Sequence, residues 1–163
     1  MLLDLGKIVE NPGRVPFTCA PELEDLHFDA VARWLSPFHA EGEVLNSADV
    51  LTLRAEASVK MLCICDRCGR EYEAEKRLEL TVPLSAALEE DDDPDIYPVV
   101  DGKVDLDEIF ITALVLDMDT KFLCSEDCPG LCPKCGKPLR DGPCGCEGEK
   151  DPRLAVLEQL LAQ

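Results

Sequence analysis

Eight of the ten cysteines stand in four closely spaced pairs, and this spacing indicates metal binding. The pairs are Cys65 and Cys68, Cys124 and Cys128, Cys132 and Cys135, and Cys144 and Cys146. The first and third pairs share the pattern Cys-x-x-Cys-Gly, in which both thiolates can reach one tetrahedral ion at about 2.3 Å. The glycine can take the positive φ with which a chain commonly leaves such a turn. Four pairs supply the ligands of two zinc sites with four thiolates each.

Locality favours one grouping of these pairs. Cys132, Cys135, Cys144 and Cys146 lie within fifteen residues, and Gly142-Pro143 can turn the chain back between them. We expect these four to share one ion and the remaining two pairs to share the other. The alternative grouping joins both Cys-x-x-Cys-Gly turns around one ion, as in many two-knuckle zinc ribbons.

The alternatives to metal ligation are redox dithiols and cysteines that only pack. For Cys19 and Cys63, which have no partner at ligand spacing, packing in the core is the expectation. If the four pairs are redox-active, the chain is a thiol redox or metal-responsive regulatory protein.

A structural role for zinc follows from the composition of the sites. Catalytic zinc sites usually keep three protein ligands and an open position for water. Here the thiols fill two closed sites, and His27 and His39, the two histidines, lie outside the cysteine segments. The sequence also lacks a Gly-rich phosphate loop, a Gly-x-Ser-x-Gly elbow and a His-Glu-x-x-His helix. We therefore expect a protein that is not an enzyme.

Charge and hydropathy narrow the possible partners. The 163 residues include 34 acidic and 16 basic ones, a net charge of −18, which argues against a general phosphate-binding surface and against DNA as a partner. The start of the chain lacks the features of a signal peptide, and no stretch approaches the length of a membrane span. We expect a cytoplasmic protein that engages no membrane and keeps its cysteines reduced.

The elements that must position the cysteines begin with a hairpin. Odd positions from 51 to 63 are apolar and even positions through 60 are polar, and a similar alternation runs from 71 to 82. Period-two alternation predicts two strands with one buried face each, and the turn at 65–70 joins them. The segments around 14–19 and 38–45 are weaker candidates for the same antiparallel sheet. We expect this sheet to be barrel-like in an α+β fold.

Two helices are expected. Asp105, with Glu108 three residues later, is a good N-cap for a helix from about 106 to 117. Asp151-Pro152 predicts the start of a second helix, at the C-terminus. The acid-rich stretch at 89–108, interrupted by prolines and a glycine, predicts a solvated loop. We therefore divide the chain into a β-rich core over 1–120, with an acidic loop at 89–104, and a zinc-binding extension with the C-terminal helix over 121–163.

The cysteine motifs resemble those of a known family. Cys65-Asp66-Arg67-Cys68 at the end of a strand is similar to the Cys-x-Arg-Cys turn of the YceD family, the large-ribosomal-RNA-subunit accumulation proteins. The run FLCSEDCPGLCPKCG at 122–136, then Cys144-Gly145-Cys146 and Asp151-Pro152-Arg153, resembles the second hallmark of that family. The resemblance spans roughly 38–160. One departure lies at 138–140, where Pro-Leu-Arg stands in place of an Asn-Leu-Asn stretch.

The resemblance implies a bacterial ribosome-biogenesis factor that supports accumulation or processing of 23S rRNA and assembly of the large subunit. The implied partners are a large-subunit rRNA precursor, a basic ribosomal protein, or both. Because the net charge is −18, we expect RNA to contact only a near-neutral face of the protein. Such a face is expected around the cysteine turns, from Arg67, Arg70, Lys134, Lys137 and Arg140. Otherwise the acidic body holds a basic protein.

Overall fold

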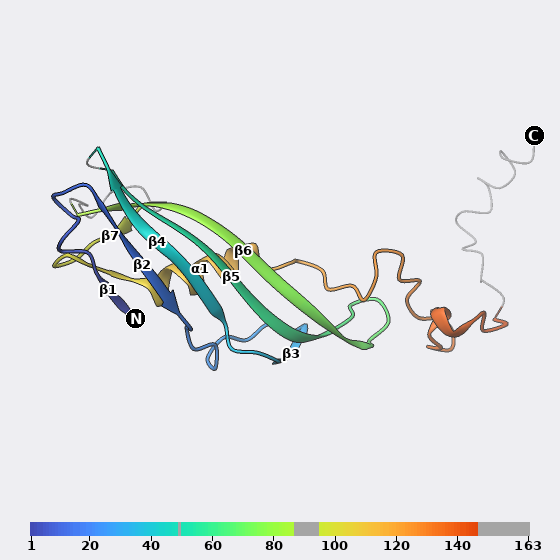
Figure 1. Cartoon of the computed structure of the whole chain (residues 1–163). Helices are drawn as coiled ribbons and strands as arrows, with labels where there is room; N and C mark the ends of the chain where they lie inside the picture. Colours follow the sequence, from blue (N-terminus) through green and yellow to red (C-terminus); the bar gives the residue numbers. More distant parts are fainter. Residues whose placement is uncertain (49, 87–94, 147–163) are drawn as a thin grey trace, which may run out of the picture.

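The computed structural model describes residues 1–48, 50–86 and 95–146. A twisted β-sheet with one α-helix against it forms the body of the molecule (Figure 1). The cysteine-rich segment continues beyond one end of this body, next to the tip of the longest hairpin. The fold is therefore α+β, as expected.

The long hairpin is the backbone of the sheet. Strands β5 (Val50–Ile64) and β6 (Glu71–Ser85) pair antiparallel in one unbroken register from Leu51↔Leu84 to Ile64↔Glu71. The odd positions of β5 are buried and the even positions are more exposed, which follows from the period-two alternation of the sequence. The predicted hairpin is confirmed.

The other strands flank this hairpin or form a small second sheet. They are β1 (Leu2–Asp4), β2 (Gly13–Cys19), β3 (Val31–Trp34), β4 (His39–Ser47), β7 (Tyr97–Pro98) and β8 (Lys103–Asp105). The main sheet has the order β2-β4-β5-β6-β7, with β3 also paired to β5, and β1 pairs with β8 separately. Strands β2 and β4 confirm the two weaker candidates of the sequence.

The expectation of a barrel-like sheet is wrong. Closure requires the two edge strands to bond to each other, whereas the order of the main sheet ends at β2 on one side and at β7 on the other. Strand β7 pairs parallel with β6 over Leu84 and Ser85 alone. The apolar face is covered by a helix instead of by the curvature of the sheet itself.

That cover is helix α1 (Leu106–Asp117), whose side chains share one buried cluster with the sheet. The N-cap expected at Asp105 is present, and its carboxylate accepts a hydrogen bond from the backbone N–H of Asp107 at 3.0 Å. Phe110 is 0 % exposed, and its ring centroid lies 6.0 Å from those of Phe17 and Phe38. The expected packing of Cys19 and Cys63 is also found, since both are buried.

A half-buried ion pair fastens the end of α1 to the sheet. The ammonium of Lys76, on the inner face of β6, lies 3.0 Å from the carboxylate of Asp117 and 3.4 Å from that of Asp119.

No helix among the described residues has the length and apolar character needed to cross a membrane. The helix expected after Asp151 and the acidic residues at 89–94 lie outside the described residues.

Candidate metal centres

The tip of the β5–β6 hairpin forms the turn that carries the first cysteine pair. The backbone N–H of Cys65 donates to the carbonyl of Arg70 at 2.9 Å, and that of Gly69 donates to the carbonyl of Cys65 at 2.8 Å. Gly69 has φ = 68°, which only glycine adopts at little cost. The turn therefore reverses the chain while Cys65 and Cys68 present their sulfurs on one side.

The two residues between these cysteines dock the second pair against the turn. Asp66 is bonded to Phe122 in both directions, since its backbone N–H donates to the Phe122 carbonyl at 2.8 Å and its carboxylate accepts from the Phe122 N–H at 2.7 Å. The guanidinium of Arg67 donates to the carbonyls of Glu126 at 3.3 Å and Cys128 at 3.1 Å. These contacts hold the 122–128 segment at the hairpin tip.

At Gly130 the backbone of the extension comes close to the backbone of the hairpin turn. Its φ is 75°, and a Cβ at this position would lie 3.1 Å from the carbonyl oxygen of Arg67. The glycine therefore lets the extension pass directly over the turn.

The first thiol group has the dimensions of a tetrahedral site. Its four sulfurs lie within 4.8 Å of one another, and they belong to Cys65, Cys68, Cys124 and Cys128. The Sγ–Sγ distance is 3.8 Å between Cys65 and Cys128 and 3.7 Å between Cys68 and Cys124. Four thiolates at about 2.3 Å from a central zinc ion stand about 3.8 Å apart, whereas a disulfide needs about 2.05 Å. The donor set and its spacing fit a shared metal ion.

The second thiol group repeats this design farther along the chain. Its sulfurs also lie within 4.8 Å of one another and belong to Cys132, Cys135, Cys144 and Cys146. The backbone N–H of Cys132 donates to the Lys137 carbonyl at 2.9 Å, and that of Gly136 donates to the Cys132 carbonyl at 2.9 Å. The same turn therefore occurs at both Cys-x-x-Cys-Gly motifs. Two of the four thiols, Cys135 and Cys146, are exposed, so this group is more open than the first.

The backbone favours one thiolate in the first group. Burial raises the pKa of the Cys65 thiol, but hydrogen bonds from the backbone of Cys124, Cys68 and Arg67 outweigh burial and lower its pKa to about 6. The Arg70 backbone likewise favours the thiolate of Cys68, but burial and the neighbouring thiols raise the pKa of Cys68 to about 11. Within this pair, Cys65 therefore forms a thiolate easily and Cys68 resists forming one.

The second group behaves in the same way. Backbone hydrogen bonds from Cys135 and Lys134, with help from the Cys144 thiol, lower the pKa of Cys132 to about 6. The adjacent thiols of Cys135 and Cys144 raise the pKa of Cys146 to about 12. A divalent cation removes this mutual repulsion, because metal ligation requires deprotonated thiols and stabilises them. Both groups are therefore compatible with a bound metal ion.

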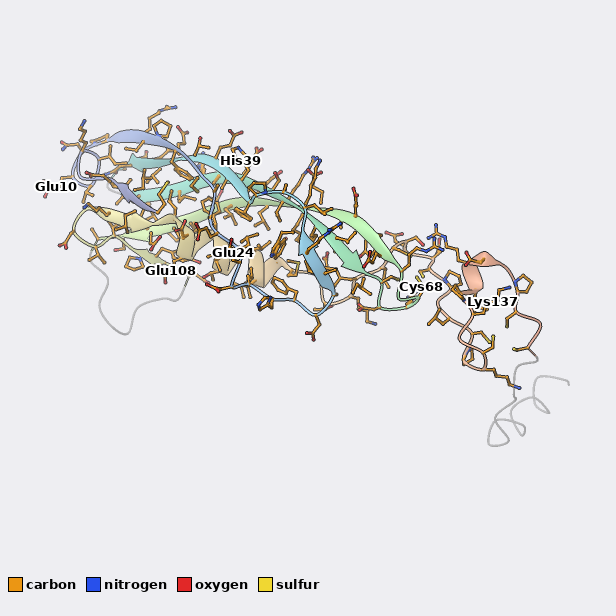
Figure 2. All side chains as sticks on the ribbon, turned by 90° about the horizontal axis from the view of Figure 1, so that it is seen from below. Glu10, Glu24, His39, Cys68, Glu108 and Lys137 are labelled. Atoms are coloured by element: carbon orange, nitrogen blue, oxygen red, sulfur yellow. The ribbon has the colours of Figure 1, made fainter. Side chains whose placement is uncertain are left out.

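The 3₁₀-helix η1 (Leu139–Asp141) lies between Cys135 and Cys144 of the second group and contacts the first group. The guanidinium of Arg140 donates to the sulfur of Cys124 at 3.6 Å, and that of Arg70 lies 3.3 Å from the carboxylate of Asp141. The segment between Cys135 and Cys144 thus places the cation of Arg140 against Cys124, a thiol of the first group. Figure 2 shows Cys68 at the hairpin tip and Lys137 beyond it, toward the end of the molecule.

All eight cysteines singled out in the sequence lie in these two groups, and the grouping is the one that locality favours. The two Cys-x-x-Cys-Gly turns do not share a group. Sequence reasoning missed the docking roles of Asp66 and Arg67 and the contact of Arg140 with Cys124. Their position beside the ligands was the available signal, but their partners lie 16 to 61 residues away in the sequence.

Loss of the Arg67 guanidinium tests the docking of the Cys124–Cys128 loop. Arg67→Ala should weaken metal binding at the first group about 10- to 100-fold, the range for residues that orient metal ligands. Competition with a coloured chelator measures this affinity. The control is Arg70→Ala, because the Arg70 side chain pairs with the exposed Asp141 and not with the loop. Equal affinities for Arg67→Ala and the unmodified protein would contradict the docking role.

Comparison with known proteins places these motifs in a wider context. The family model described as "Large ribosomal RNA subunit accumulation protein YceD" matches residues 52–161, which include the hairpin and both thiol groups. An uncharacterized protein of Mycobacterium tuberculosis is 36% identical over 101 residues, which cover 60% of this chain and 49% of that protein. One of Mycobacterium leprae is 26% identical over 169 residues, or 99% of this chain and 78% of that protein.

The chain spans about half the length of the first of these relatives. The Mycobacterium bovis relative gives the same identity and coverage as that of Mycobacterium tuberculosis. No solved structure matches the chain.

Proposed function

Because this chain belongs to the YceD family of large ribosomal RNA subunit accumulation proteins, we propose that it is a zinc-binding ribosome-biogenesis factor and not an enzyme. Its role is to support the accumulation or processing of 23S rRNA and the assembly of the large subunit in the cytoplasm. The observation that carries the proposal is the family match over residues 52–161, which spans the hairpin and both thiol groups.

Zinc is the metal that suits these groups best. Four thiolates in a tetrahedral arrangement are typical of structural zinc sites. Bound zinc would supply a cross-link that holds the extension in place. With four protein ligands each, the two groups leave no position for a reacting water, which supports a role without catalysis. The convergence of four sulfurs within 4.8 Å in each group favours a shared ion over a redox dithiol, which needs only two.

An rRNA precursor would meet the cysteine-rich end of the molecule. The guanidinium groups of Arg67, Arg70 and Arg140 bond to acceptors within the protein, as described above. Lys134 is exposed within the Cys132–Cys135 turn of the second group, and Lys137 is exposed just after this turn. Because both side chains are exposed at this end of the molecule, we place the RNA contact at these two lysines.

Charge reversal tests this contact. Lys134→Glu with Lys137→Glu should weaken cosedimentation with large-subunit precursors and leave the zinc content unchanged. Two phosphate contacts predict a shallow dependence on salt, with a slope below about 2 in a plot of log affinity against log salt. The matched control is Lys7→Glu with Lys103→Glu, two exposed lysines of the body that lie outside the cysteine-rich segment. Cosedimentation that survives the first reversal would contradict the RNA contact, and absence of cosedimentation by the unmodified protein would overturn the proposed function.

A further inference from the structure

We propose that the free edge of strand β6 receives an extended, basic segment of a partner protein as an additional strand of the sheet. The inference rests on the proposed function in one respect, which is that assembling ribosomal particles offer basic proteins. The hydrogen bonds, the charge and the apolar margin of the edge indicate this occupant, and the edge is separate from the thiol groups.

The edge is open along most of its length. Strand β6 pairs with β5 at every position from Glu71 to Leu84. On its other side it pairs with β7 at Leu84 and Ser85 alone. Within the part of the chain that the structure describes, no strand pairs with this side of β6 between Glu71 and Pro83. An unpaired edge strand is a template for the addition of another strand.

The hydrogen bonds at the two ends of β6 identify the unpaired backbone groups. The N–H of Cys65 donates to the carbonyl of Arg70, so Arg70 bonds toward β5, whereas the carbonyl of Ser85 accepts from Val99 on the opposite side. The register between these points is unbroken, and bonding direction alternates along an antiparallel strand. The odd residues from 71 to 81 therefore direct their N–H and C=O groups to the free edge. Pro83, also odd, fits this assignment because its missing N–H would lie on the free side.

The same odd residues make the edge acidic. Their side chains lie on the outer face of the sheet, where all of them are exposed, and they are Glu71, Glu73, Glu75, Arg77, Glu79 and Thr81. The one base among them, Arg77, lies 2.7 Å from the carboxylate of Glu75. The charge continues across the sheet, because Glu79 is opposite Glu56 and Glu56 is opposite Glu41. Like charges directly opposite one another are destabilising, and a strand of basic residues would relieve this repulsion.

The inner side of the edge is apolar at both ends. Tyr72 and Ala74 are half-buried against one core cluster, and Leu80 and Val82 against the other. Lys76 lies between them and is paired with carboxylates at the end of α1. Side chains alternate between the two faces of a strand. The fitting segment therefore alternates basic residues on the outer face with apolar residues that cover this margin.

A second copy of this chain does not fit the edge. Antiparallel pairing of two β6 edges would place glutamates of one copy opposite glutamates of the other. The acidic side chains thus disfavour self-association and favour a basic occupant.

A defined probe tests the edge on the full, metal-loaded chain. The probe is a labelled eleven-residue peptide that alternates Lys with Val and Thr, and the control is the same peptide N-methylated at four consecutive central amides. N-methylation removes backbone donors and leaves the charge unchanged. We expect the N-methylated peptide to bind at least tenfold more weakly, as measured by fluorescence anisotropy. Equal binding of the two peptides would mean attraction by charge alone and would overturn the proposal.

Variants of the chain locate the binding to β6. Arg77→Pro should weaken binding of the unmodified peptide at least tenfold, because Pro blocks the free edge without removing a bond to β5. Arg77→Ala is its matched control and should not weaken binding. Glu75→Lys with Glu79→Lys should also weaken binding at least tenfold, whereas Glu10→Lys with Glu24→Lys, which are exposed and lie outside β6, should not. Unchanged zinc content and thermal midpoint establish that each variant folds.

Other outcomes would identify a different occupant of the edge, or would separate the edge proposal from the proposed function. A dimer that Arg77→Pro dissociates would make the occupant a second copy. Displacement of the peptide by single-stranded polyuridylate at the same site would make it RNA. If the unmodified protein binds no peptide but still cosediments with large-subunit precursors, the edge proposal fails and the proposed function stands. If it binds the peptide through β6 but never cosediments, the edge stands and the proposed function fails.

Discussion

Replacement of Cys128 by serine is expected to remove one of the two zinc ions that we propose for this chain and to release the extension from the hairpin tip. The Cys128 side chain is 2 % exposed, and its sulfur lies 3.8 Å from that of Cys65. A serine hydroxyl is a poor substitute for a thiolate ligand. Zinc contributes about 10–16 kcal/mol to the folding of small zinc-finger peptides. We expect a loss of more than about 4 kcal/mol of unfolding free energy, which is the scale of losing a structural metal.

Elemental analysis and thermal unfolding check this result. The thermal midpoint should fall by more than about 8–16 °C, since each kcal/mol shifts it by about 2–4 °C in a chain of this size. Limited proteolysis should cut between α1 and Phe122. The matched variant, Cys146→Ser, should also lose one zinc ion. It should keep the contacts of Asp66 and Arg67 with the 122–128 segment, so proteolysis should not cut between α1 and Phe122. Two zinc ions in Cys128→Ser, or none in the unmodified protein purified without chelator, would contradict the assignment.

Phe110→Ala is expected to destabilise the body by about 3–5 kcal/mol, the usual cost of emptying a buried aromatic site. Phe110 is 0 % exposed and its ring lies 6.0 Å from those of Phe17 and Phe38, so the sheet and the loop before β4 each lose an aromatic contact with α1. Helix α1 covers the apolar face of an open sheet, and Phe110 belongs to the buried cluster that the two share. Urea unfolding followed by circular dichroism measures the change in free energy.

The control lies on the same helix. Leu116 is 79 % exposed, so Leu116→Ala should change the unfolding free energy by less than about 0.5 kcal/mol. Both variants should keep the zinc content of the unmodified protein, because neither residue belongs to a thiol group. A cost below about 1.5 kcal/mol for Phe110→Ala would contradict the packing of α1 against the sheet.

Sequence patterns that span a few residues predicted the long hairpin, the start of α1 and the two thiol groups. The alternation at 51–63 and 71–82 identified β5 and β6 because a strand repeats every two residues, and a single register keeps one face apolar. Asp105 identified the start of α1 because a cap acts on the first turn of its own helix. The spacing of the cysteines identified both thiol groups, since one to three residues between two cysteines keep their sulfurs within reach of one ion.

The edges of the sheet are where prediction failed. Whether β2 meets the far side of the sheet depends on strand number, twist and the position of α1, and no local pattern encodes these. The parallel pairing of β7 and the separate β1–β8 sheet join residues that are distant in sequence. An edge is defined by the absence of a neighbour, so the open side of β6 could be identified only from the tertiary structure.

The sequence by itself determined which residues bear the chemistry, because thiol spacing, strand alternation and helix capping act over a few neighbouring residues. Only the tertiary structure decided how these parts meet. It placed Arg67 on the carbonyls of the Cys124–Cys128 loop, Arg140 on a sulfur of the other group, and the glutamates of β6 along an unpaired edge. The physical reason is that each of these contacts joins segments brought together by folding, where burial and hydrogen bonding act across space and leave no period in the sequence.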